Sequence, residues 1–523
     1  MPATLPAWPP ALTPEQQAEL LLEASAYALA HGFTLLPVHP PSGPPPAPTH
    51  AIAAPLSLFP TPFPRSEYER ARSLQTAYNA LYARVALDQE FIDRVIGSVA
   101  KVDTFQGELW TRWKGVRAEL PQPVQLGIFR SDYLLHASES SFEIKQVEFN
   151  TIAASFGALS QKAGEMHRFL AQTTGAFYGA APELADATAY PDNHSLEELA
   201  AGLAQGWKVY GNKDAVVLVV VQEGERNVFD QRGLQYELLS KHGVRSVRYT
   251  FAELGRLAQV DPSSKHLLIP NPLTPNAPPS EIAVVYYRAA YTPTDYTSSK
   301  EWDTRVLLER SLAIKCPTMA LQLAGAKKVQ QELALPGVLE DFLLGSSRPD
   351  VGLGAGAGSL TQEDVDAVRA TWTGLWPMDD SEEGLEAQRL AETHPERFVL
   401  KPQREGGGNN IYRTDIPPYL AKLAAEPSNP GDPPKREGYI LMELIEPPQG
   451  VHNWLVRGGE GKPRLADVVS ELGVYGVSLF GGKDAKSIVN RSAGTLLRTK
   501  GRESDEGGVA IGISSIDSPL LVN

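Results

Sequence analysis

Short apolar runs that alternate with helical stretches constrain the fold of this chain more than any other feature. Six β-rich runs, each bounded by polar turns, occupy residues 125–130, 142–149, 215–221, 283–287, 398–400 and 439–442. Helical patterns fill intervals such as 227–242 and 302–313. Strands and helices mixed over such a length are typical of α/β or α+β enzymes. The sequence therefore predicts an α/β (α+β) fold without internal repeats.

The N-terminal region combines one clear helix signal with many prolines. Thr13, Pro14 and Gln16 form the pattern of an N-cap, an N1 proline and a capping-box glutamine, and Gly32 is a suitable stop. The first 64 residues hold 16 of the 43 prolines. Because proline cannot continue a helix or a central strand, residues 37–64 are expected to wrap the surface as extended chain. From 67 to about 118 the pattern is helical, and from Val124 it is strand-like.

Charge and cysteine content exclude several classes of function. The 523-residue chain has a net charge of −14, which disfavours general binding to nucleic acid or to anionic membranes. Its single cysteine, Cys316, allows neither an intrachain disulfide nor a cysteine-based zinc site, and its apolar surroundings favour a buried structural role. No Lys or Arg precedes Arg65, so the positive start of a secretory signal is missing. These features predict a cytoplasmic protein that binds no nucleic acid and no membrane.

The most informative stretch is FVLKPQREGGGNNIY at 398–412. Three apolar residues predict a buried strand that ends near Lys401, because Pro402 prevents its continuation. The glycines 406–408 would expose backbone N–H groups, so amides and one ammonium could lie against a triphosphate. Glu405 could hold the accompanying Mg²⁺. A glycine hairpin with solvated charges is the alternative, and the Lys, Arg, Glu and Asn side chains around the glycines favour phosphate binding over it.

Two further stretches place charges on one face of a strand. In 144–159, Glu148 and Asn150 are two residues apart and point the same way, which suits a second site for a hard cation or, equally, a polar sheet edge. In 496–512, Arg498 and Lys500 share a face, and Arg502 follows if the strand continues. Such a stripe is either a solvated face or the positive wall of an anion site. Salt screens the net negative charge beyond about 8 Å, so a cleft for anions must supply its own cations. Lys327, Lys401, Arg498 and Lys500 are the candidates.

Other chemistries lack their residues. No HExxH zinc motif and no G-x-S-x-G nucleophile elbow occurs. The alternating glycines between Ser346 and Ser359 do not complete a dinucleotide-binding fingerprint and are interpreted as a surface loop.

Taken together, these stretches resemble the eukaryotic-type glutathione synthetases, a branch of the ATP-grasp ligases. The matching segments occur in family order over about 380 residues: RSDYLLH (130–136), IKQVEFNTIAASFGAL (144–159), QEGERNVFDQR (222–232), VVYYRAAYTP (284–293), LAIKCPTMALQLAGAKKVQQELA (312–334), the glycine-rich stretch 398–412, YILMELIEP (439–447), SELGVYGV (470–477) and LLRTKGRESDEGGVAIG (496–512).

The resemblance implies an ATP-grasp fold with an inserted parallel-sheet substrate-binding domain and a glycine-rich lid. The implied divisions are an N-terminal part of the body at 1–213, the inserted domain at 214–327, and the rest of the body at 328–523 with the lid at about 360–440. The implied reaction joins γ-glutamylcysteine and glycine, with ATP as co-substrate, to give glutathione, ADP and phosphate. It also implies Mg²⁺, two per active site, and a homodimer.

The resemblance assigns roles by position. Catalytic roles fall on Arg498, Lys401 and Lys327, and the metal ligands are Glu148, Asn150 and Glu405. The implied ATP site comprises Glu148, Lys327, Lys401, Glu405, Gly406, Gly407, Gly408, Asn409, Asn410, Tyr412, Met442, Glu443, Leu444, Ile445, Glu471, Lys500 and Glu506. The implied substrate site comprises Arg130, Ile152, Ala153, Ala154, Ser155, Glu225, Arg226, Asn227, Gln231, Arg288, Tyr291, Arg498, Val509 and Ala510.

Three positions depart from the family's usual pattern. Ala153 stands where Ser is common, so the contact of a side-chain hydroxyl is lost and only main-chain atoms can bind a ligand there. Glu506 replaces an Asp, and Leu444 replaces a common Lys. Two alternatives stay open: a sister ligase that uses another small amine, such as β-alanine or serine, and a non-catalytic nucleotide-binding regulator. The amine pocket near Ala510 would separate the ligases, whereas loss of the charged site residues would indicate a regulator.

Overall fold

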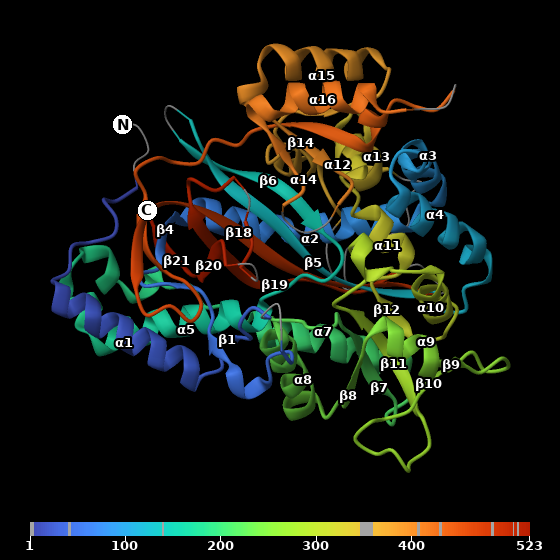
Figure 1. The fold of residues 1–523 in the computed structure, drawn as a ribbon, viewed down its shortest axis with the longest axis horizontal. Helices are drawn as coiled ribbons and strands as arrows, with labels where there is room; N and C mark the ends of the chain where they lie inside the picture. Colours follow the sequence, from blue (N-terminus) through green and yellow to red (C-terminus); the bar gives the residue numbers. More distant parts are fainter. Residues whose placement is uncertain are drawn as a thin grey trace.

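Three larger sheets, two two-stranded sheets and their covering helices build the described part of the molecule, so the predicted mixed α/β class is confirmed (Figure 1). The computed structural model describes residues 5–39, 43–138, 141–345, 359–404, 408–427, 431–482, 486–505, 507–509 and 512–523. Within these ranges, no helix is both long enough and apolar enough to cross a membrane.

A seven-stranded sheet forms the centre. Its order is β17 (His452–Val456), β3 (Leu56–Ser57), β20 (Ser514–Asp517), β19 (Lys486–Gly501), β18 (Pro463–Gly481), β5 (Val124–Ala137) and β6 (Phe142–Asn150). All neighbours are antiparallel except β3 and β20. The long strands β18, β19, β5 and β6 run side by side, so residues far apart in the sequence share one face.

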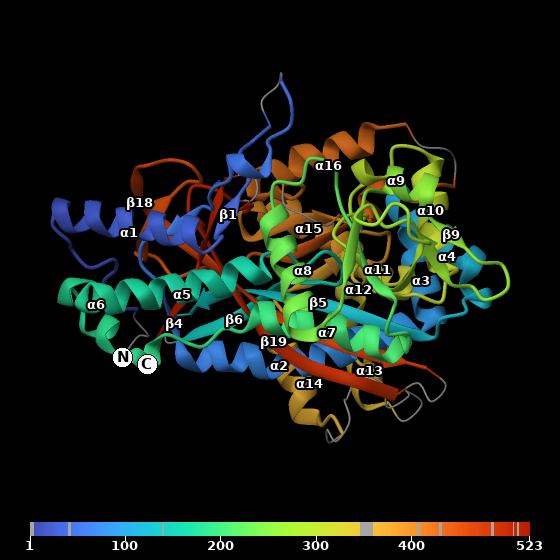
Figure 2. The ribbon, with the colours of Figure 1, turned by 90° about the horizontal axis from the view of Figure 1, so that it is seen from below.

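Helices cover both faces of this sheet. A Cβ atom on Gly476 of β18 would meet Asn79 of α2 (Arg65–Leu87), whereas a Cβ on Gly202 of α7 (Ser195–Tyr210) meets the next residue along β18, Val477. Neighbouring strand residues point to opposite faces, so α2 and α7 lie on opposite sides. The side of α7 also carries α5 (Gly157–Thr173), along which α1 (Pro14–Ala30) packs (Figure 2).

The second sheet has six strands drawn from residues 216–316. β8 (Ser246–Tyr249), β7 (Val216–Val220), β11 (Ser280–Tyr287) and β12 (Ile314–Cys316) pair in parallel, and β10 (Leu267–Ile269) and β9 (Gln259–Val260) add antiparallel pairs. All five residues of β7 are buried, as expected for a parallel strand covered on both faces. The predicted helix at 302–313 begins and ends earlier, as α10 (Ser299–Glu309), because Ser298 caps it and β12 follows closely.

The third sheet is small and antiparallel, with the order β13 (Leu375–Pro377), β16 (Tyr439–Glu443), β14 (Phe398–Pro402) and β15 (Ile411–Tyr412). The helices α15 (Glu382–Thr393) and α16 (Ile416–Ala425) cover it at the top of Figure 1. Phe398, Leu400 and Leu441 form its separate core together with residues of both helices.

The remaining elements are four short strands, which pair as two two-stranded sheets, and further helices. They are β1 (Thr34–Leu35), β2 (Ile52–Ala53), β4 (Thr61–Pro64), α3 (Gln89–Val99), α4 (Thr104–Val116), α6 (Gly175–Gly179), α8 (Val228–His242), α9 (Phe251–Leu257), α11 (Met319–Ala324), α12 (Lys327–Ala334), α13 (Val338–Leu344), α14 (Gln362–Arg369) and β21 (Pro519–Val522). The capping box predicted for α1 is present, with Gln16 N donating to Thr13 Oγ1 and Thr13 N to Gln16 Oε1.

The proline-rich segment corrects one prediction. Residues 54–63 are buried, and β3 pairs with strands on both sides instead of wrapping the surface. The strand is only two residues long, so the prolines flank it and no ladder N–H is lost. Proline has no N–H but keeps its carbonyl group, and the carbonyl oxygen of Pro55 accepts a hydrogen bond from Ile516 N at 2.9 Å. Proline spacing alone does not show that the partner strands supply the missing contacts.

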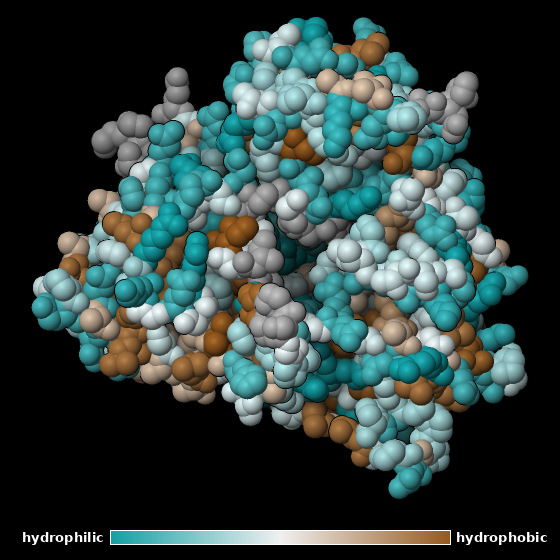
Figure 3. Space-filling view, viewed as in Figure 1, coloured by the Kyte–Doolittle hydropathy of each residue, from teal (hydrophilic) through white to brown (hydrophobic). Residues whose placement is uncertain are grey.

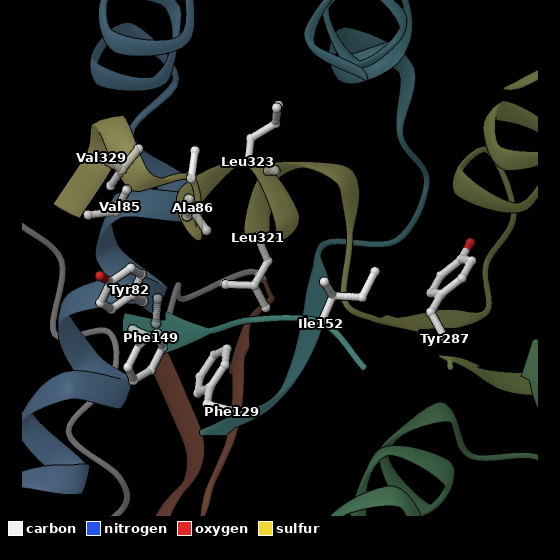
Figure 4. Packing of buried hydrophobic residues seen from close by; sticks show 14 of the residues in the cluster. Tyr82, Val85, Ala86, Phe129, Phe149, Ile152, Tyr287, Leu321, Leu323 and Val329 are labelled. Atoms are coloured by element: carbon white, nitrogen blue, oxygen red, sulfur yellow. The ribbon is translucent and has the colours of Figure 1, made fainter. Parts of the chain in front are cut away.

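The core between α2 and the central sheet is rich in aromatic rings. Phe149 of β6 stacks on Tyr82 of α2 with ring centroids 3.9 Å apart and an interplanar angle of 10°, and Phe129 of β5 lies 5.2 Å away (Figure 4). Outside, hydrophilic side chains dominate the face in Figure 3, which is hollowed near its centre. The aromatic contacts fix β6 against α2, so its other face is held in place for the site described next.

Candidate active site

The main pocket lies where the central sheet meets the small sheet. It has a volume of about 320 Å³, and its walls come from β5, β6, β18 and β19 on one side and from β14, β15 and β16 on the other. The sequence-predicted residues that line it are Arg130, Glu148, Asn150, Ile152, Ala153, Ala154, Ser155, Tyr291, Lys401, Asn410, Tyr412, Met442, Glu443, Leu444, Ile445, Glu471, Arg498 and Lys500. The three stretches singled out in the sequence (144–159, 398–412 and 496–512) thus converge on one cavity, together with Arg130, Tyr291, Glu471 and the residues 442–445.

Other predicted residues lie beside the pocket or outside the described part of the chain. Lys327 and Arg288 contact lining residues, whereas Glu225, Arg226, Asn227, Gln231, Gly408, Asn409 and Val509 are not among the lining residues. Glu405, Gly406, Gly407, Glu506 and Ala510 lie outside the described residues, as does most of the glycine-alternating segment 346–359.

Two lysines flank Glu148. Lys327, the first residue of α12, places its Nζ 2.9 Å from Glu148 Oε2, and Lys401 of β14 donates to the carbonyl oxygen of Val147 at 2.9 Å. Burial would raise the pKa of Glu148, but the charges of Lys327, Lys401 and Arg498 outweigh it and hold this pKa far below the usual value. Glu148 is therefore ionised at neutral pH.

The predicted cationic stripe is present on β19 for Arg498 and Lys500, which both line the pocket, as the two-residue period requires. The strand ends at Gly501, so Arg502 lines the pocket from the turn that follows and is not part of the strand face. Arg498 donates to Glu471 of β18 and, at 3.1 Å, to Asp132 Oδ2 of β5. Burial raises the pKa of Glu471 while Arg498 opposes that rise, so the arginine is the main counter-charge of this carboxyl group.

Glu148 and Asn150 present oxygen atoms on the pocket face of β6. Asn150 Nδ2 donates to Asp132 Oδ2 at 3.0 Å, which leaves Oδ1 of the amide for another partner. A carboxylate held ionised and an amide oxygen two residues along one strand are hard donors of the kind that Mg²⁺ prefers. These two side chains fit a magnesium site. Among the residues that the structure describes, no group of three or more His, Cys, Asp or Glu is placed so that it could hold a metal ion, and Glu405 lies outside them.

Strand β16 and the residues after it form the opposite wall. The backbone N–H of Glu443 donates to Gly374 O at 2.9 Å, and that of Leu444 donates to Arg397 O at 2.8 Å. The strand is thereby fixed to β13 and to the start of β14. Met442, Glu443, Leu444 and Ile445 form a rigid, partly apolar surface of the kind that accommodates a flat ring.

The loop between β6 and α5 closes the substrate end. Ala153 and Phe156 have φ of 54° and 74°, a left-handed conformation that costs energy in residues other than glycine. Arg288 Nη2 donates to Ser155 Oγ at 2.6 Å, and Tyr475 OH donates to Ser155 O. The loop is therefore held by Arg288, which directly follows β11, and by Tyr475 of β18.

Sequence reasoning missed two buried carboxylates. Asp230 of α8 accepts hydrogen bonds from the backbone N–H groups of Phe156 and Ala158, both at 2.9 Å, and pairs with Arg288 at 3.3 Å. Asp132 lies under Arg130 and Arg498. Both are fully buried and both fall within the segments RSDYLLH and QEGERNVFDQR. The available signal was proximity in the sequence, since Asp132 is two residues from the predicted Arg130 and Asp230 is next to the predicted Gln231.

Comparisons with known protein families, sequences and structures all point to the same family. The chain matches the model described as "Eukaryotic glutathione synthase, ATP binding domain" over residues 14–521. It is 37% identical to the glutathione synthetase large chain of Schizosaccharomyces pombe over 97% of this chain and 98% of that protein, and 38% identical to the glutathione synthetases of Bos taurus (98% and 99%) and Homo sapiens (97% and 98%). The solved structure of a glutathione synthetase-like effector from Globodera pallida shares the fold, with a TM-score of 0.72, 23% identity and 98% coverage of both chains.

Proposed function

The chain belongs to the eukaryotic glutathione synthetase family, and we propose that its main pocket is the site where ATP, γ-glutamylcysteine and glycine react. As a member, it is an ATP-dependent ligase of glutathione synthesis. The single observation that carries the proposed site is the meeting of Lys401, Arg498 and Lys500 with Glu148 and Asn150 in one cavity. Such a set suits a polyphosphate and the divalent cation bound to it.

The chemistry explains why these residue types are needed. An amide does not form readily from a carboxylate and an amine in water, so the γ-phosphate of ATP is first transferred to the cysteinyl carboxylate of the dipeptide. Positive groups stabilise the charge on the transferred phosphoryl group and on the acyl phosphate. We assign Lys327 and Lys401 to the phosphates, and Arg498 to the reacting carboxylate, which its planar guanidinium can bind with two hydrogen bonds.

Magnesium, when bound, would neutralise negative charge on the phosphates of ATP. Glu148 and Asn150 would hold it, with Glu405 as a further ligand by family resemblance. Two ions per site is part of the same proposal. The chain's own contribution is to keep Glu148 ionised through the neighbouring lysines, so that the carboxylate is available at neutral pH.

The remaining walls divide between nucleotide and dipeptide. We assign the surface at 442–445 to adenine, which backbone groups can read, and Asn410, Tyr412, Glu471 and Lys500 to the rest of ATP. We assign Arg130, Ser155 and Tyr291 to γ-glutamylcysteine, because they line the opposite end beside the strained loop. Glu225, Arg226, Asn227, Gln231 and Arg288 would complete that end, and Val509 and Ala510 would lie on the glycine side.

The proposed division into domains is supported by where each sheet draws its strands. The six-stranded sheet uses residues 216–316, within the proposed inserted domain 214–327, and the small sheet uses 375–443, close to the proposed lid at about 360–440. The central sheet joins 1–213 to 328–523 through the pairing of β5 with β18. We also propose a homodimer, by family membership, and a cytoplasmic location, since the single buried Cys316 can form no intrachain disulfide.

Product analysis tests the function directly. The protein with Mg-ATP and γ-glutamylcysteine is incubated with and without glycine, and ADP and tripeptide are both measured. Tripeptide equal to ADP is expected with glycine. ADP without tripeptide would contradict the ligase assignment, and ATP binding with no turnover would indicate a regulator. Competition of β-alanine or serine against glycine at equal concentration measures which amine is incorporated, and the glycine product is expected to predominate. The molar mass of the protein, measured by light scattering as it leaves a size-exclusion column, tests the homodimer.

A further inference from the structure

Asp132 occupies a position in the site that none of the assigned roles explains. It lies on β5, opposite Glu148 of β6 and opposite Gly473 of β18, in the middle of the central sheet. Its side chain is fully buried, and it is not among the residues that line the pocket. A buried carboxylate is costly unless charged donors surround it, so its partners define its role.

Four donors converge on this one carboxylate. Arg130 approaches side-on, with Nε 2.6 Å from Oδ1 and Nη2 2.7 Å from Oδ2. Arg498 Nη2 lies 3.1 Å from Oδ2, and Asn150 Nδ2 lies 3.0 Å from the same oxygen. All three partners do line the pocket, and they come from three different strands. Asp132 therefore contacts, from beneath, one residue of each proposed function: dipeptide binding, carboxylate activation and metal binding.

The backbone around Asp132 leaves room for this arrangement at one position. A Cβ atom on Gly473 would stand 2.8 Å from Arg130 Cδ and 2.9 Å from Asp132 Oδ1, closer than real Cβ contacts allow. Glycine at 473 is thus what lets the arginine–aspartate pair lie flat against β18. The pair is built into the sheet and is more than a chance contact of two flexible side chains.

We propose that Asp132 is the positioning residue of the active site, which sets the orientation of Arg130 and Arg498 and fixes the amide of Asn150 with its oxygen free for the metal. The inference rests on the proposed function of the pocket. Asp132 acts through its partners, because it touches the pocket only through them. Its side-on pairing turns Nη1 of Arg130 toward Ser155 O, 3.4 Å away in the loop assigned to the dipeptide. Its acceptance of the Asn150 N–H determines which atom of that amide is available.

The variant Asp132→Asn tests this with almost no change in volume. An amide offers one acceptor oxygen and one NH₂ group. With NH₂ in place of Oδ1, Arg130 Nε faces a donor; with NH₂ in place of Oδ2, Arg130, Arg498 and Asn150 all lose their acceptor. In either orientation at least one partner turns, and misplacement of a reacting group by about 1 Å can cost on the order of 100-fold in rate.

Asp517→Asn is the matched control. Asp517 is also buried in the central sheet, and it accepts from Thr61 Oγ1 at 2.6 Å and from Thr499 Oγ1 at 2.7 Å, but it does not line the pocket or contact a lining residue through these bonds. Both variants place an amide where a buried carboxylate stood. A merely structural role of Asp132 predicts the same behaviour from both: lower thermal stability with unchanged kinetics of the folded enzyme.

The expected result separates the use of the dipeptide from the binding of ATP. For Asp132→Asn, kcat/KM for γ-glutamylcysteine falls about 100-fold, whereas KM for ATP changes less than about threefold, because the residues assigned to adenine do not contact Asp132. The rise in Tm that γ-glutamylcysteine produces in the wild type is lost and the rise that ATP alone produces is kept. The further rise that Mg²⁺ adds to that of ATP is reduced, because the Asn150 amide is no longer fixed. Folded Asp132→Asn with kcat/KM within about threefold of wild type overturns the proposal, as does an equal loss in Asp517→Asn.

If Asp132→Asn does not fold, the variant Gly473→Ala tests the positioning role of Asp132. The added methyl group displaces the same Arg130–Asp132 pair without changing any charge, so a fall in kcat/KM for γ-glutamylcysteine supports the positioning role and wild-type kinetics overturn it. Failure of both variants to fold overturns it too and makes Asp132 a structural residue. A wild-type enzyme that forms no tripeptide refutes the function of the pocket instead, so the two failures are distinguishable.

Discussion

Replacing Glu148 by Gln removes one charge from the pocket while keeping the shape of the side chain. Glu148 Oε2 lies 2.9 Å from Lys327 Nζ, and the exposed fractions of the two side chains are 22% and 5%. At an effective dielectric constant of about 20, such a pair attracts by roughly 6 kcal/mol before desolvation is counted. Desolvation cancels much of this, and the Gln oxygen still accepts a hydrogen bond, so we expect a net loss of about 1–3 kcal/mol in stability.

The effect on magnesium is expected to be larger than the effect on folding. Mg²⁺ relies on one or two carboxylates in addition to phosphate oxygens, so the loss of Glu148 should raise the half-saturating concentration of free Mg²⁺ at least about tenfold. The assay is ADP release against free Mg²⁺ at fixed ATP, with Tm measured alongside. Glu143→Gln is the control, because Glu143 lies on the same strand, pairs with Lys145 at 3.0 Å and is away from the pocket. An unchanged magnesium requirement in Glu148→Gln, with Tm lowered, would refute the reasoning.

Three further predictions concern single side chains. Arg498→Lys keeps the charge but loses the planar two-donor geometry, so kcat should fall about 100-fold at nearly constant Tm; wild-type kcat would remove Arg498 from the chemistry. Phe149→Ala removes a ring stacked on Tyr82 and should lower the free energy of unfolding by about 3–5 kcal/mol, which is followed as a lower Tm. Phe149→Leu should lower it clearly less. Burial holds the pKa of His167 below 6.5 against the opposing charge of Asp517, so the unfolded chain binds more protons there, and stability rises as the pH rises toward 6.5. His167→Gln should flatten the slope of Tm against pH between about 5.5 and 6.5, and an unchanged slope would contradict this.

Strand periodicity predicted the parts of the site that are local. Glu148 and Asn150 share the pocket face of β6 because successive side chains alternate, and Arg498 and Lys500 share that face of β19 for the same reason. The boundaries of the apolar runs were also close, since β14 ends at Pro402, where proline prevents its continuation. These features depend on a few neighbouring residues and can be read from the sequence without knowledge of the rest of the chain.

The partners of those residues depend on register over long distances and could not be predicted in this way. Lys327 meets Glu148 only because α12 begins beside β6, and Asp132 meets Arg498 because β5 and β19 both flank β18. The burial of the proline-rich β3 has the same origin, since its neighbours β17 and β20 come from the last 75 residues of the chain. A pattern predicts which face a residue takes, whereas the register of distant strands decides what it meets.

This division explains why stability and chemistry are closely linked in the central sheet. Along β6, Glu148 and Asn150 face the pocket while Phe149 between them packs against α2. Along β19, Arg498 faces the pocket while Leu497 beside it is buried in the core. A one-residue slip of either strand would bury the charges and expose the apolar side chains, so the packing of the core selects the register that assembles the site. Asp132 differs from these residues, because it shares a strand face with Arg130 but is buried beneath its partners and does not line the pocket. The three side chains that it contacts are correctly placed only when β5, β6 and β19 are all in register.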